Sequence, residues 1–343
     1  MNPLLSVVIP TKNRYYTLEF LVKLLVSYKD KDIEIVIQDN SDDNSDFLSF
    51  IKSIDVPERN LKYFYDSAFM PISKNIDHAV NNSTGDYICI LGDDDAVTHS
   101  IMTCVKYMKA QDIDSMVFPL VSYVWPGVQG QNSIDNFSHG LLSIPNTNGE
   151  IREINAQVEF EKCMVNGARS LELMPKAYHG VVKRSILSEV YAKTGSFFPG
   201  PSPDMANAVA LSFFVKKHAY YDLPVMVHGH SISSAGGLGR AGKHVEKNLL
   251  KLPFLGENIN EIWDKNIPKI WTGETIYAIS AFEALNRIGK ISLKENFNYQ
   301  EFYSNFLKCH PNLIADLFQV EDKSLLLELK TIFTLIFNLP IHH

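Results

Sequence analysis

Three consecutive carboxylates, Asp93 to Asp95, directly follow an uncharged run from Tyr87 to Leu91. The run is rich in β-branched and aromatic residues, which is typical of a strand buried on both faces. Like charges at the end of such a strand repel one another and resist desolvation, and a hard divalent cation with oxygen ligands relieves both costs. An acidic turn that caps a helix beginning near Ala96 is the alternative, because carboxylates favour helix N-termini. Both explanations stay open on this stretch alone.

A single carboxylate, Asp204, follows the apolar and proline-rich segment from Phe197 to Pro203. The three prolines of this segment restrict the backbone and give the carboxylate a fixed position. A helix is expected directly behind it, from Met205 to Lys216. Capping of that helix by Asp204 is the alternative to a functional role, and it also stays open.

A glycine- and serine-rich stretch from His228 to Arg240 contains a second histidine, His230. Backbone amides in such a stretch can cradle phosphates, and a histidine there can ligate a metal. A flexible linker with solvent-facing histidines is the alternative. The fragment that begins at Gly229 has Ser233 where a nucleophile elbow needs its second glycine, so a serine hydrolase is not indicated.

Strands and helices alternate along the first 110 residues. The strands are expected at Leu4–Ile9, Ile33–Ile37, Leu61–Tyr65 and Tyr87–Leu91, and the helices at Tyr15–Tyr28, Phe47–Ile54, Ser73–Asn82 and Ile101–Lys109. This alternation predicts a doubly wound α/β fold with a mostly parallel sheet flanked by helices, of the Rossmann-like type. Ligands bind outside the carboxyl ends of the strands in such sheets. The polar segments that follow the first, second and fourth strands are therefore expected on one rim: Thr11–Arg14, Asp39–Asn40 and Asp93–Asp95.

The rest of the chain changes from mixed to helical patterns. Further strands are expected at Ser115–Phe118, His179–Arg184 and Tyr220–Val227, and helices at Ala156–Asn166 and Ser185–Lys193. The segment Pro126–Glu150 shows no periodicity and is expected to be a loop insertion near the active rim. The apolar periodicity beyond residue 241 predicts a helical C-terminal appendage, with helices at Thr275–Ile288, Tyr299–Leu307, Leu313–Val320 and Ser324–Phe337.

The composition excludes several classes of protein. The net charge of −7 and the pI near 5.9 argue against a nucleic-acid binder, which would carry a basic face. The four cysteines lie far apart without a CxxC pair, so neither a zinc site nor a disulfide framework is indicated. The N-terminus lacks the features of a secretory signal, so the cytoplasm is the expected location, with the inner face of the membrane as an alternative. The apolar run Leu325–Phe337 is too short to span a bilayer and is expected to pack on the domain or on a second copy of the chain; peripheral membrane contact is the alternative.

Four motifs occur in order along the first half of the chain. They are Ser6–Arg14 (SVVIPTKNR), Glu34–Ser41 (EIVIQDNS), Lys74–Asn75, and Thr84–Ile88 (TGDYI) followed by Asp93–Asp95. Together these motifs resemble family 2 inverting glycosyltransferases of the GT-A fold. The resemblance is close over about the first 110 residues and extends loosely to Ser234. It implies a GT-A catalytic domain over 1–240, with a donor-nucleotide half at 1–110 and an acceptor half at 111–240, before the helical region 241–343.

The resemblance implies a donor-binding role for seven residues. They are Pro10, Thr11, Asn13, Arg14, Asp39, Lys74 and Asp93. The loop around Pro10 and Thr11 holds the nucleobase, usually uracil, together with Asp39. Lys74 approaches the diphosphate, and Asp93 lies on the ribose side.

The resemblance also implies a metal site and a catalytic base. Asp94 is the expected ligand of Mn²⁺ or Mg²⁺, with Asp95 acting through water and His228 and His230 as further metal or phosphate contacts. Gly92 stands where many members carry the first Asp of the motif, and this departure leaves the assignment within the triplet open. Asp204 matches the catalytic carboxylate of the family by its order in the chain and its loop-to-helix setting.

With these residues, the resemblance implies transfer of a sugar from a nucleotide-diphosphate sugar to an acceptor hydroxyl with inversion. The expected donor is a UDP-sugar. The expected acceptor is a saccharide or a lipid-linked saccharide, in the synthesis of a bacterial surface polysaccharide or glycolipid. A nucleotidyltransferase that makes a nucleotide-sugar is one alternative, although it would normally need a glycine-rich basic loop after the first strand. A non-catalytic module that binds a nucleotide-sugar is the other.

Overall fold

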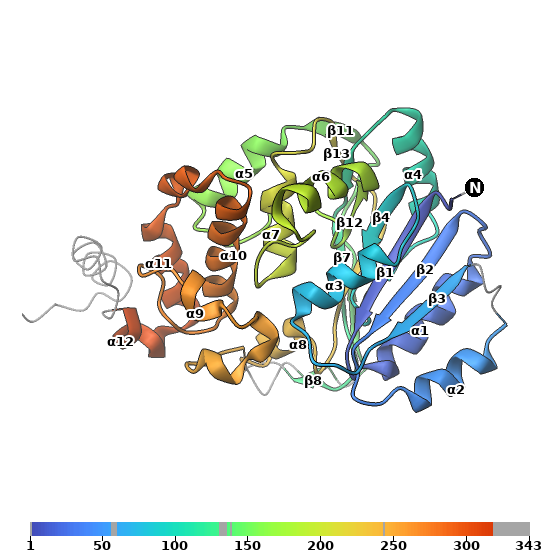
Figure 1. The fold of residues 1–343 in the computed structure, drawn as a ribbon, viewed down its shortest axis with the longest axis horizontal. Coiled ribbons are helices and arrows are strands. Elements are labelled where there is room, and N and C mark those ends of the chain that lie inside the picture. The colour runs from blue at the N-terminus through green and yellow to red at the C-terminus, as the bar shows by residue number, and fades with distance from the viewer. Residues whose placement is uncertain (1, 56–59, 130–135, 138, 243, 318–343) are drawn as a thin grey trace, which may run out of the picture.

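The computed structural model describes residues 2–55, 60–129, 136–137, 139–242 and 244–317. A large central sheet is covered by helices, and a smaller sheet and a helical C-terminal region adjoin it (Figure 1). The elements of the first half are β1 (Leu5–Thr11), α1 (Tyr15–Ser27), β2 (Ile33–Asp39), α2 (Ser45–Ser53), β3 (Leu61–Tyr65), α3 (Ile72–Asn81), β4 (Tyr87–Ile90) and α4 (Ile101–Ala110). Each lies within about two residues of its prediction, because uninterrupted apolar runs and helical periodicity mark these segments without ambiguity.

The central sheet has the strand order β11-β13-β6-β12-β4-β1-β2-β3. It includes β6 (Ser115–Val117), β11 (Ile151–Ile154), β12 (Gly180–Lys183) and β13 (His218–Tyr221). The pairings make β12 and β11 antiparallel to their neighbours, and the other six strands run in one direction. The predicted α/β class with a mostly parallel sheet is therefore confirmed. The central parallel strands β1, β2 and β4 are buried along their length, whereas the edge strand β3 is half-buried and ends at the exposed Tyr65.

A second sheet has the order β10-β7-β14-β5 and continues directly from the carboxyl end of β4. Its strands are β5 (Ala96–Val97), β7 (Leu120–Val124), β10 (Leu141–Ser143) and β14 (Met226–His230). The three aspartates therefore lie at the junction between a strand of one sheet and a strand of the other. The alternative in which they cap a helix beginning near Ala96 is wrong, because the next residues are extended and α4 begins at Ile101.

The prediction of one strand over Tyr220–Val227 is wrong. This segment contributes to two strands, β13 and β14, which belong to different sheets. A turn at Asp222–Pro224 divides them, and the amide of Leu223 donates to the carbonyl of Tyr221 within it. Proline has no amide hydrogen for a ladder and ends the first strand. Because β14 enters the second sheet and contains His228 and His230, these histidines are not in a flexible linker. They are in a strand, and a short helix, α8 (Ala235–Arg240), comes next.

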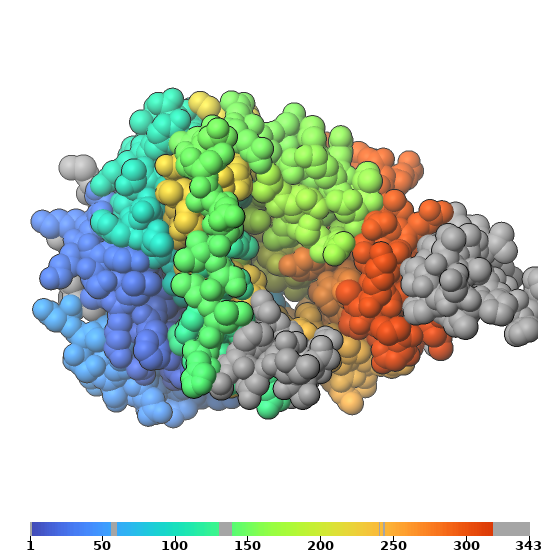
Figure 2. Space-filling view, turned by 180° about the vertical axis from the view of Figure 1, so that it is seen from behind, coloured from blue at the N-terminus to red at the C-terminus, as the bar shows by residue number. Residues whose placement is uncertain are grey.

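The segment predicted as a loop over Pro126–Glu150 contains short strands in its described part. They are β8 (Val128–Gln129), β9 (Asn136–Phe137) and β10, which pairs with β7. Single-sequence periodicity misses strands of two or three residues. In Figure 2 the green segment that carries β10 and β11 crosses the back of the molecule between the blue N-terminal half and the orange C-terminal helices.

The helices of the second half pack into one continuous core. They are α5 (Ala156–Val165), α6 (Arg184–Thr194), α7 (Pro203–Leu211), α9 (Ile259–Ile262), α10 (Gly273–Arg287), α11 (Tyr299–Cys309) and α12 (Ile314–Leu317), with short 3-10 turns at Leu249–Lys251, Pro253–Leu255, Ile291–Asn296 and Pro311–Leu313. Buried side chains of α3, α7, α10 and α11 belong to one hydrophobic cluster, among them Ile76, Val209, Phe282 and Phe306. The C-terminal region is thus fixed to the body of the molecule through α7 and α10, which lie side by side (Figure 1).

The helices predicted after residue 241 are found where the structure describes them. The helix predicted over Ser324–Phe337 lies outside the described residues, as do the last three residues of the one over Leu313–Val320, whose described part contains α12. The domain boundary at 240 and the expected oligomer or membrane contact through this terminus stay predictions. Within the described part of the chain, no helix combines the length and the apolar character needed to cross a bilayer.

Candidate functional site

Asp93 is fully buried at the end of β4 and is paired with a cation. Its Oδ2 accepts hydrogen bonds from Thr11 Oγ1 at 2.6 Å and Arg14 Nε at 3.0 Å, and Arg14 Nη2 lies 2.9 Å from its Oδ1. Burial raises the pKa of Asp93 to about 7, although Arg14 opposes this change. Burial works against the charge of Arg14, but Asp93 and Asp94 outweigh it and raise the guanidinium pKa. The first aspartate and the loop after β1 therefore form one unit.

Asp95 is held by the backbone and by a histidine. Its Oδ2 accepts from the amide of Gly92 at 2.6 Å and lies 2.6 Å from His179 Nε2, and its Oδ1 accepts from the amide of Gly229 at 2.8 Å. Burial alone would raise the pKa of Asp95, but His179 and these hydrogen bonds outweigh it and hold the pKa below its usual range.

Asp94 is the least neutralised member of the triplet. Its Oδ2 accepts from the amide of Ser231 at 2.9 Å. Among the described residues, the one cation near it is Arg14, whose Nη1 lies 3.9 Å from its Oδ1. Its backbone carbonyl accepts from Trp125 Nε1 at 2.8 Å, which fixes the main chain. Local partners therefore neutralise Asp93 and Asp95 and leave Asp94 with capacity for a further cation.

The approach of β14 to the triplet depends on a glycine. A Cβ at Gly229 would lie 1.8 Å from the carbonyl oxygen of Asp94, so a side chain does not fit there. The absence of that side chain lets the amides of Gly229 and Ser231 reach the carboxylates of Asp95 and Asp94. The sequence predicted that amides of this stretch cradle phosphates, whereas these two amides bind the protein's own carboxylates.

Three side chains of this site could together hold a metal ion. They are Asp95, His179 and His228, whose ligand atoms all lie within 4.8 Å of one another, and they form the only such group in the part of the chain that the structure describes. The rings of His179 and His228 lie 4.6 Å apart, and His230 packs 4.3 Å from His228 without joining the group. Sequence reasoning named His228 and missed His179, whose position depends on the antiparallel entry of β12 beside β4.

The loops after β1 and β2 form the neighbouring part of the rim. Thr11 and Asp39 are register partners on parallel strands. Asp39 is fully buried and accepts from the hydroxyls of Tyr15 and Tyr63, each at 2.6 Å, and from the amide of Ser41 at 2.9 Å. These contacts fix the carboxylate of Asp39 at the strand end, directly beside the loop that carries Arg14.

The remaining candidates for donor binding differ in exposure. Pro10 is buried within β1. Asn13 has a positive φ of 56° and exchanges side-chain hydrogen bonds with the next loop, to Asp42 Oδ2 at 2.9 Å and from the Asp42 amide at 3.0 Å. Lys74 is exposed in the first turn of α3. The structure therefore brings Thr11, Arg14 and the triplet into direct contact, while Lys74 forms no hydrogen bond or ion pair with them.

Asp204 lies in the first turn of α7 and is held by hydroxyl groups. Its Oδ1 accepts from Ser202 Oγ at 2.6 Å and from the amide of Met205 at 2.9 Å, and its Oδ2 accepts from Tyr277 Oη at 2.5 Å. Capping alone does not explain this arrangement, because Tyr277 belongs to α10, 73 residues downstream. The C-terminal helical region thus supplies a partner of the proposed base, which the sequence did not reveal.

The buried Lys176 and the partly buried Tyr178 connect Asp204 with the triplet electrostatically. Lys176 has its pKa lowered to about 8 by burial, while Asp204 opposes this change. Burial and then the charge of Asp95 raise the pKa of Tyr178 well above 10, and Tyr178 is also within electrostatic range of Tyr277. The segment just before β12 therefore lies between the two carboxylate sites.

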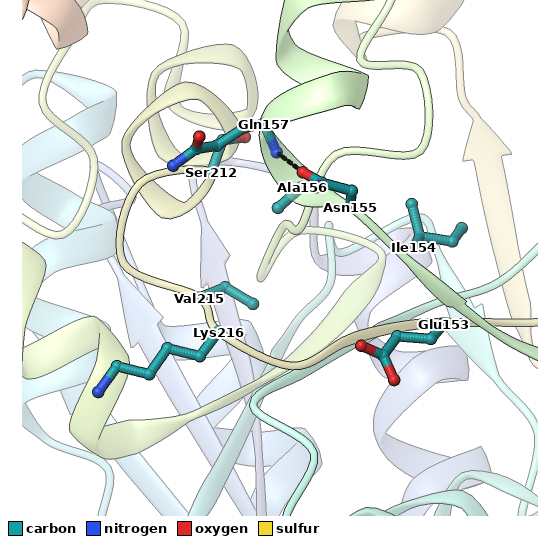
Figure 3. A pocket seen from close by; sticks show the side chains of 8 residues that line it. All are labelled: Glu153, Ile154, Asn155, Ala156, Gln157, Ser212, Val215 and Lys216. Carbon is teal, nitrogen blue, oxygen red and sulfur yellow. Dashed lines mark hydrogen bonds between the residues drawn. The ribbon is translucent and has the colours of Figure 1, made fainter.

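One pocket lies at the other end of the sheet. It has a volume of about 500 Å³ and is formed where β11 leads into α5 and α7 leads into β13 (Figure 3). Its lining residues are Glu153, Ile154, Asn155, Ala156, Gln157, Ser212, Val215 and Lys216. Because β13 runs in the direction of β4, a pocket before β13 is at the amino edge and the triplet is at the carboxyl edge. The pocket is therefore not part of the predicted site.

Comparison with known proteins gives a family for the first half of the chain. Residues 6–163 match the model of glycosyl transferase family 2. The GalNAc(5)-diNAcBac-PP-undecaprenol beta-1,3-glucosyltransferase of Campylobacter jejuni subsp. jejuni serotype O:2 is 32% identical over 119 residues, which are 34% of this chain and 37% of that enzyme. The alignment thus spans little more than a third of the relative.

Solved structures resemble the chain at low identity. S. aureus TarS 1-349 in complex with UDP-GlcNAc has 12% identity and a TM-score of 0.49, with 92% of this chain and 82% of that chain covered. The mannosyltransferase PcManGT from Pyrobaculum calidifontis, in complex with GDP-Man and Mn²⁺, has a TM-score of 0.46 and covers 98% and 82% of the two chains. These scores are too low to support an inference about the site. The match to the family model, which contains β1 and the acidic triplet, establishes that residues 6–163 of this protein belong to glycosyl transferase family 2.

Proposed function

We propose that the protein transfers a sugar from a nucleotide-diphosphate sugar to an acceptor hydroxyl with inversion. The proposed donor nucleotide is UDP. The observation that supports this best is the pairing of two kinds of carboxylate site in one molecule. A charged cluster lies at the carboxyl edge of the sheet, within the segment that matches the family, and Asp204 lies apart from it and is held by hydroxyls.

The donor nucleotide binds at the loops after β1 and β2 in this proposal. Asp93 and Asp39 are fully buried, so they act by orientation: Asp93 positions Arg14 on the ribose side, and Asp39 positions the tyrosines that face the nucleobase. Pro10, Thr11 and Asn13 shape the same loops. Lys74, exposed on α3, approaches the diphosphate as a point charge.

A divalent cation belongs to the site in this proposal, held by Asp94 together with the group of Asp95, His179 and His228. Carboxylate oxygens suit both Mg²⁺ and Mn²⁺, whereas the imidazole nitrogens favour the softer Mn²⁺. When bound, such an ion neutralises charge that develops on the diphosphate leaving group. His230 supports His228 by ring contact.

Asp204 is the general base of this proposal. Its Oδ atoms accept hydrogen bonds from three donors, which orient a carboxylate that removes the proton of the attacking hydroxyl. Attack on the face of the anomeric carbon opposite the diphosphate inverts the configuration in one displacement. The relative from Campylobacter jejuni acts on an undecaprenol-linked saccharide, and we extend to this chain a lipid-linked saccharide acceptor and a place in surface polysaccharide or glycolipid synthesis.

Incubation of the protein with a panel of nucleotide-sugars and Mn²⁺ tests this function. The expected result is slow donor hydrolysis for one or a few donors, abolished by a chelator and by Asp94→Asn. Asp46→Asn, at an exposed carboxylate of α2, is the matched control and should leave the rate unchanged. Release of pyrophosphate from a nucleoside triphosphate and a sugar phosphate would support a nucleotidyltransferase instead, and binding without turnover would support a non-catalytic module.

A further inference from the structure

Gly92 precedes the acidic triplet, and the space beside it is already filled. A Cβ at this position would lie 2.8 Å from Tyr178 Oη, 2.9 Å from Asp95 Oδ2 and 3.2 Å from Asp94 Oδ1. Real Cβ atoms do not approach other heavy atoms below 3.0 Å. The φ of Gly92 is not in the left-handed region, so the need for glycine here is one of space. A hydroxyl from a distant segment thus stands where a side chain at position 92 would begin.

The backbone fixes Tyr178 at this place. The amide of Ile90 donates to the carbonyl of Ala177 at 2.8 Å, and the amide of His179 donates to the carbonyl of Ile90 at 3.1 Å. These two bonds enclose Tyr178, which forms a parallel bridge with Ile90. His179 has a φ of 58°, an uncommon conformation for a residue with a side chain. Consecutive side chains are thereby directed to the triplet, the imidazole of His179 to Asp95 and the phenol of Tyr178 to Gly92.

The hydroxyl of Tyr178 has no hydrogen-bond partner in the described part of the chain. A phenol donates one hydrogen bond. The carboxylate oxygen closest to Gly92, Asp95 Oδ2, already accepts from the amide of Gly92 and pairs with His179. The next, Asp94 Oδ1, is left for the cation in the proposed function, because Asp94 Oδ2 accepts from the amide of Ser231. The ring is only partly buried. An anionic oxygen of a ligand is therefore the fitting acceptor.

We propose that the hydroxyl of Tyr178 takes the place of the side chain missing at position 92 and donates a hydrogen bond to a diphosphate oxygen of the sugar donor. Gly92 is glycine because this hydroxyl occupies its side-chain space. The inference rests on the proposed function, which assigns Asp94, the neighbour of this hydroxyl, to the cation at the diphosphate. A neutral donor at this point contacts the diphosphate without adding a charge beside Asp93 and Asp95, which Arg14 and His179 already pair.

Calorimetric titration with UDP and with UMP, in the presence of Mn²⁺, tests this contact in Tyr178→Phe. Loss of a hydrogen bond to a charged group lowers affinity about 10-fold or more. We expect a loss of this size for UDP, a loss of less than about twofold for UMP, because UMP lacks the β-phosphate, and no loss for Tyr107→Phe, at an exposed tyrosine of α4. Equal losses for UDP and UMP, or no loss for UDP, would overturn the inference.

A second variant keeps the test valid if Tyr178→Phe unfolds. Gly92→Ala displaces the hydroxyl of Tyr178, so this variant should have a lower affinity for UDP and an unchanged affinity for UMP. In a folded Gly92→Ala protein, the additional change Tyr178→Phe should lower the affinity for UDP little further. Additive losses would mean that the two positions act independently, against the inference. Wild-type protein that binds no nucleoside diphosphate would refute the proposed function itself, whereas wild-type binding of UDP that Tyr178→Phe leaves intact would refute only the role of Tyr178.

Discussion

The two carboxylate sites of this molecule are built from different partners. At the carboxyl edge of the central sheet, Asp93 lies beside Arg14 and accepts from the hydroxyl of Thr11. Asp95 lies beside His179 and accepts from two backbone amides. Asp204 has no cation within ion-pair distance among the described residues, and two hydroxyls and one amide hold it. One site is arranged to keep negative charge in place, and the other to present one carboxylate in a fixed orientation.

The difference shows that the two sites depend on different features of the fold. Charge at the triplet is stabilised by strands of two sheets that meet at one point, so its chemistry depends on the topology of the chain. Asp204 depends on packing between α7 and α10, because its hydroxyl partner Tyr277 comes from the C-terminal region. Substitutions at the two sites should therefore separate donor binding, turnover and stability.

The largest separation is expected for Asp204→Asn. Removal of a general base lowers turnover by about 100-fold to 10,000-fold, while the calorimetric affinity for UDP with Mn²⁺ should stay within about twofold of wild type. Steady-state rates with the identified donor and acceptor measure the first effect. Near-normal turnover in this variant would remove Asp204 from the role of base.

Gly229→Ala should damage the triplet side through packing alone. A methyl group at this position meets the carbonyl of Asp94 at 1.8 Å, so the strands must separate, at a cost of about 3 kcal/mol or more. Urea unfolding measures the change. Gly239→Ala is the matched control, because a Cβ there meets nothing within 4 Å. Equal stability of the two variants would mean that β14 does not approach the triplet as described.

Lys176→Met should stabilise the protein by about 2 kcal/mol at pH 7, because it removes a buried charge whose pKa is lowered to about 8. The sign of the pH dependence follows. Between about pH 8 and pH 10.5 the unfolded chain binds the proton more tightly than the folded chain, so wild-type stability rises with pH in this window. Below pH 8 both states are protonated, and the contribution no longer changes. Unfolding curves from pH 7 to 10.5 should show this rise in wild type and a weaker rise in the variant.

Tyr277→Phe should have the smallest effect of the four. Loss of one hydrogen bond to the carboxylate of Asp204 loosens its orientation, and about 1 kcal/mol corresponds to a roughly fivefold lower kcat. The KM for the donor should not change. A purely structural role would instead appear as a lower Tm with an unchanged kcat.

Much of the fold could be predicted because its signals are local. The runs that form β1, β2 and β4 contain little but apolar and β-branched residues, and the rule that ligands bind at the carboxyl ends of parallel strands placed Thr11, Arg14 and the triplet on one edge. The split between β13 and β14 occurs at a turn over Asp222–Pro224, and the prediction passed over Asp222 and Pro224 because apolar residues lie on both sides of them.

The partners of the site could not be predicted, because each comes from a distant segment. His179 reaches Asp95 only because β12 pairs antiparallel with β4, and Tyr277 reaches Asp204 only because α10 packs against α7. The glycine at position 92 looked like a missing aspartate in the sequence. The structure explains it by the hydroxyl of Tyr178, the neighbour in sequence of His179, which lies 84 residues from its partner Asp95.

Calorimetric titration of UDP into wild type and Asp94→Asn, with Mn²⁺ and with a chelator, tests the central claim most directly. We expect wild type to bind UDP in a Mn²⁺-dependent way and Asp94→Asn to lose about 10-fold or more of this affinity. The control Asp46→Asn should bind UDP as wild type does. Affinity for UDP that neither the chelator nor Asp94→Asn changes would contradict the assignment of the triplet edge to a cation-assisted donor site.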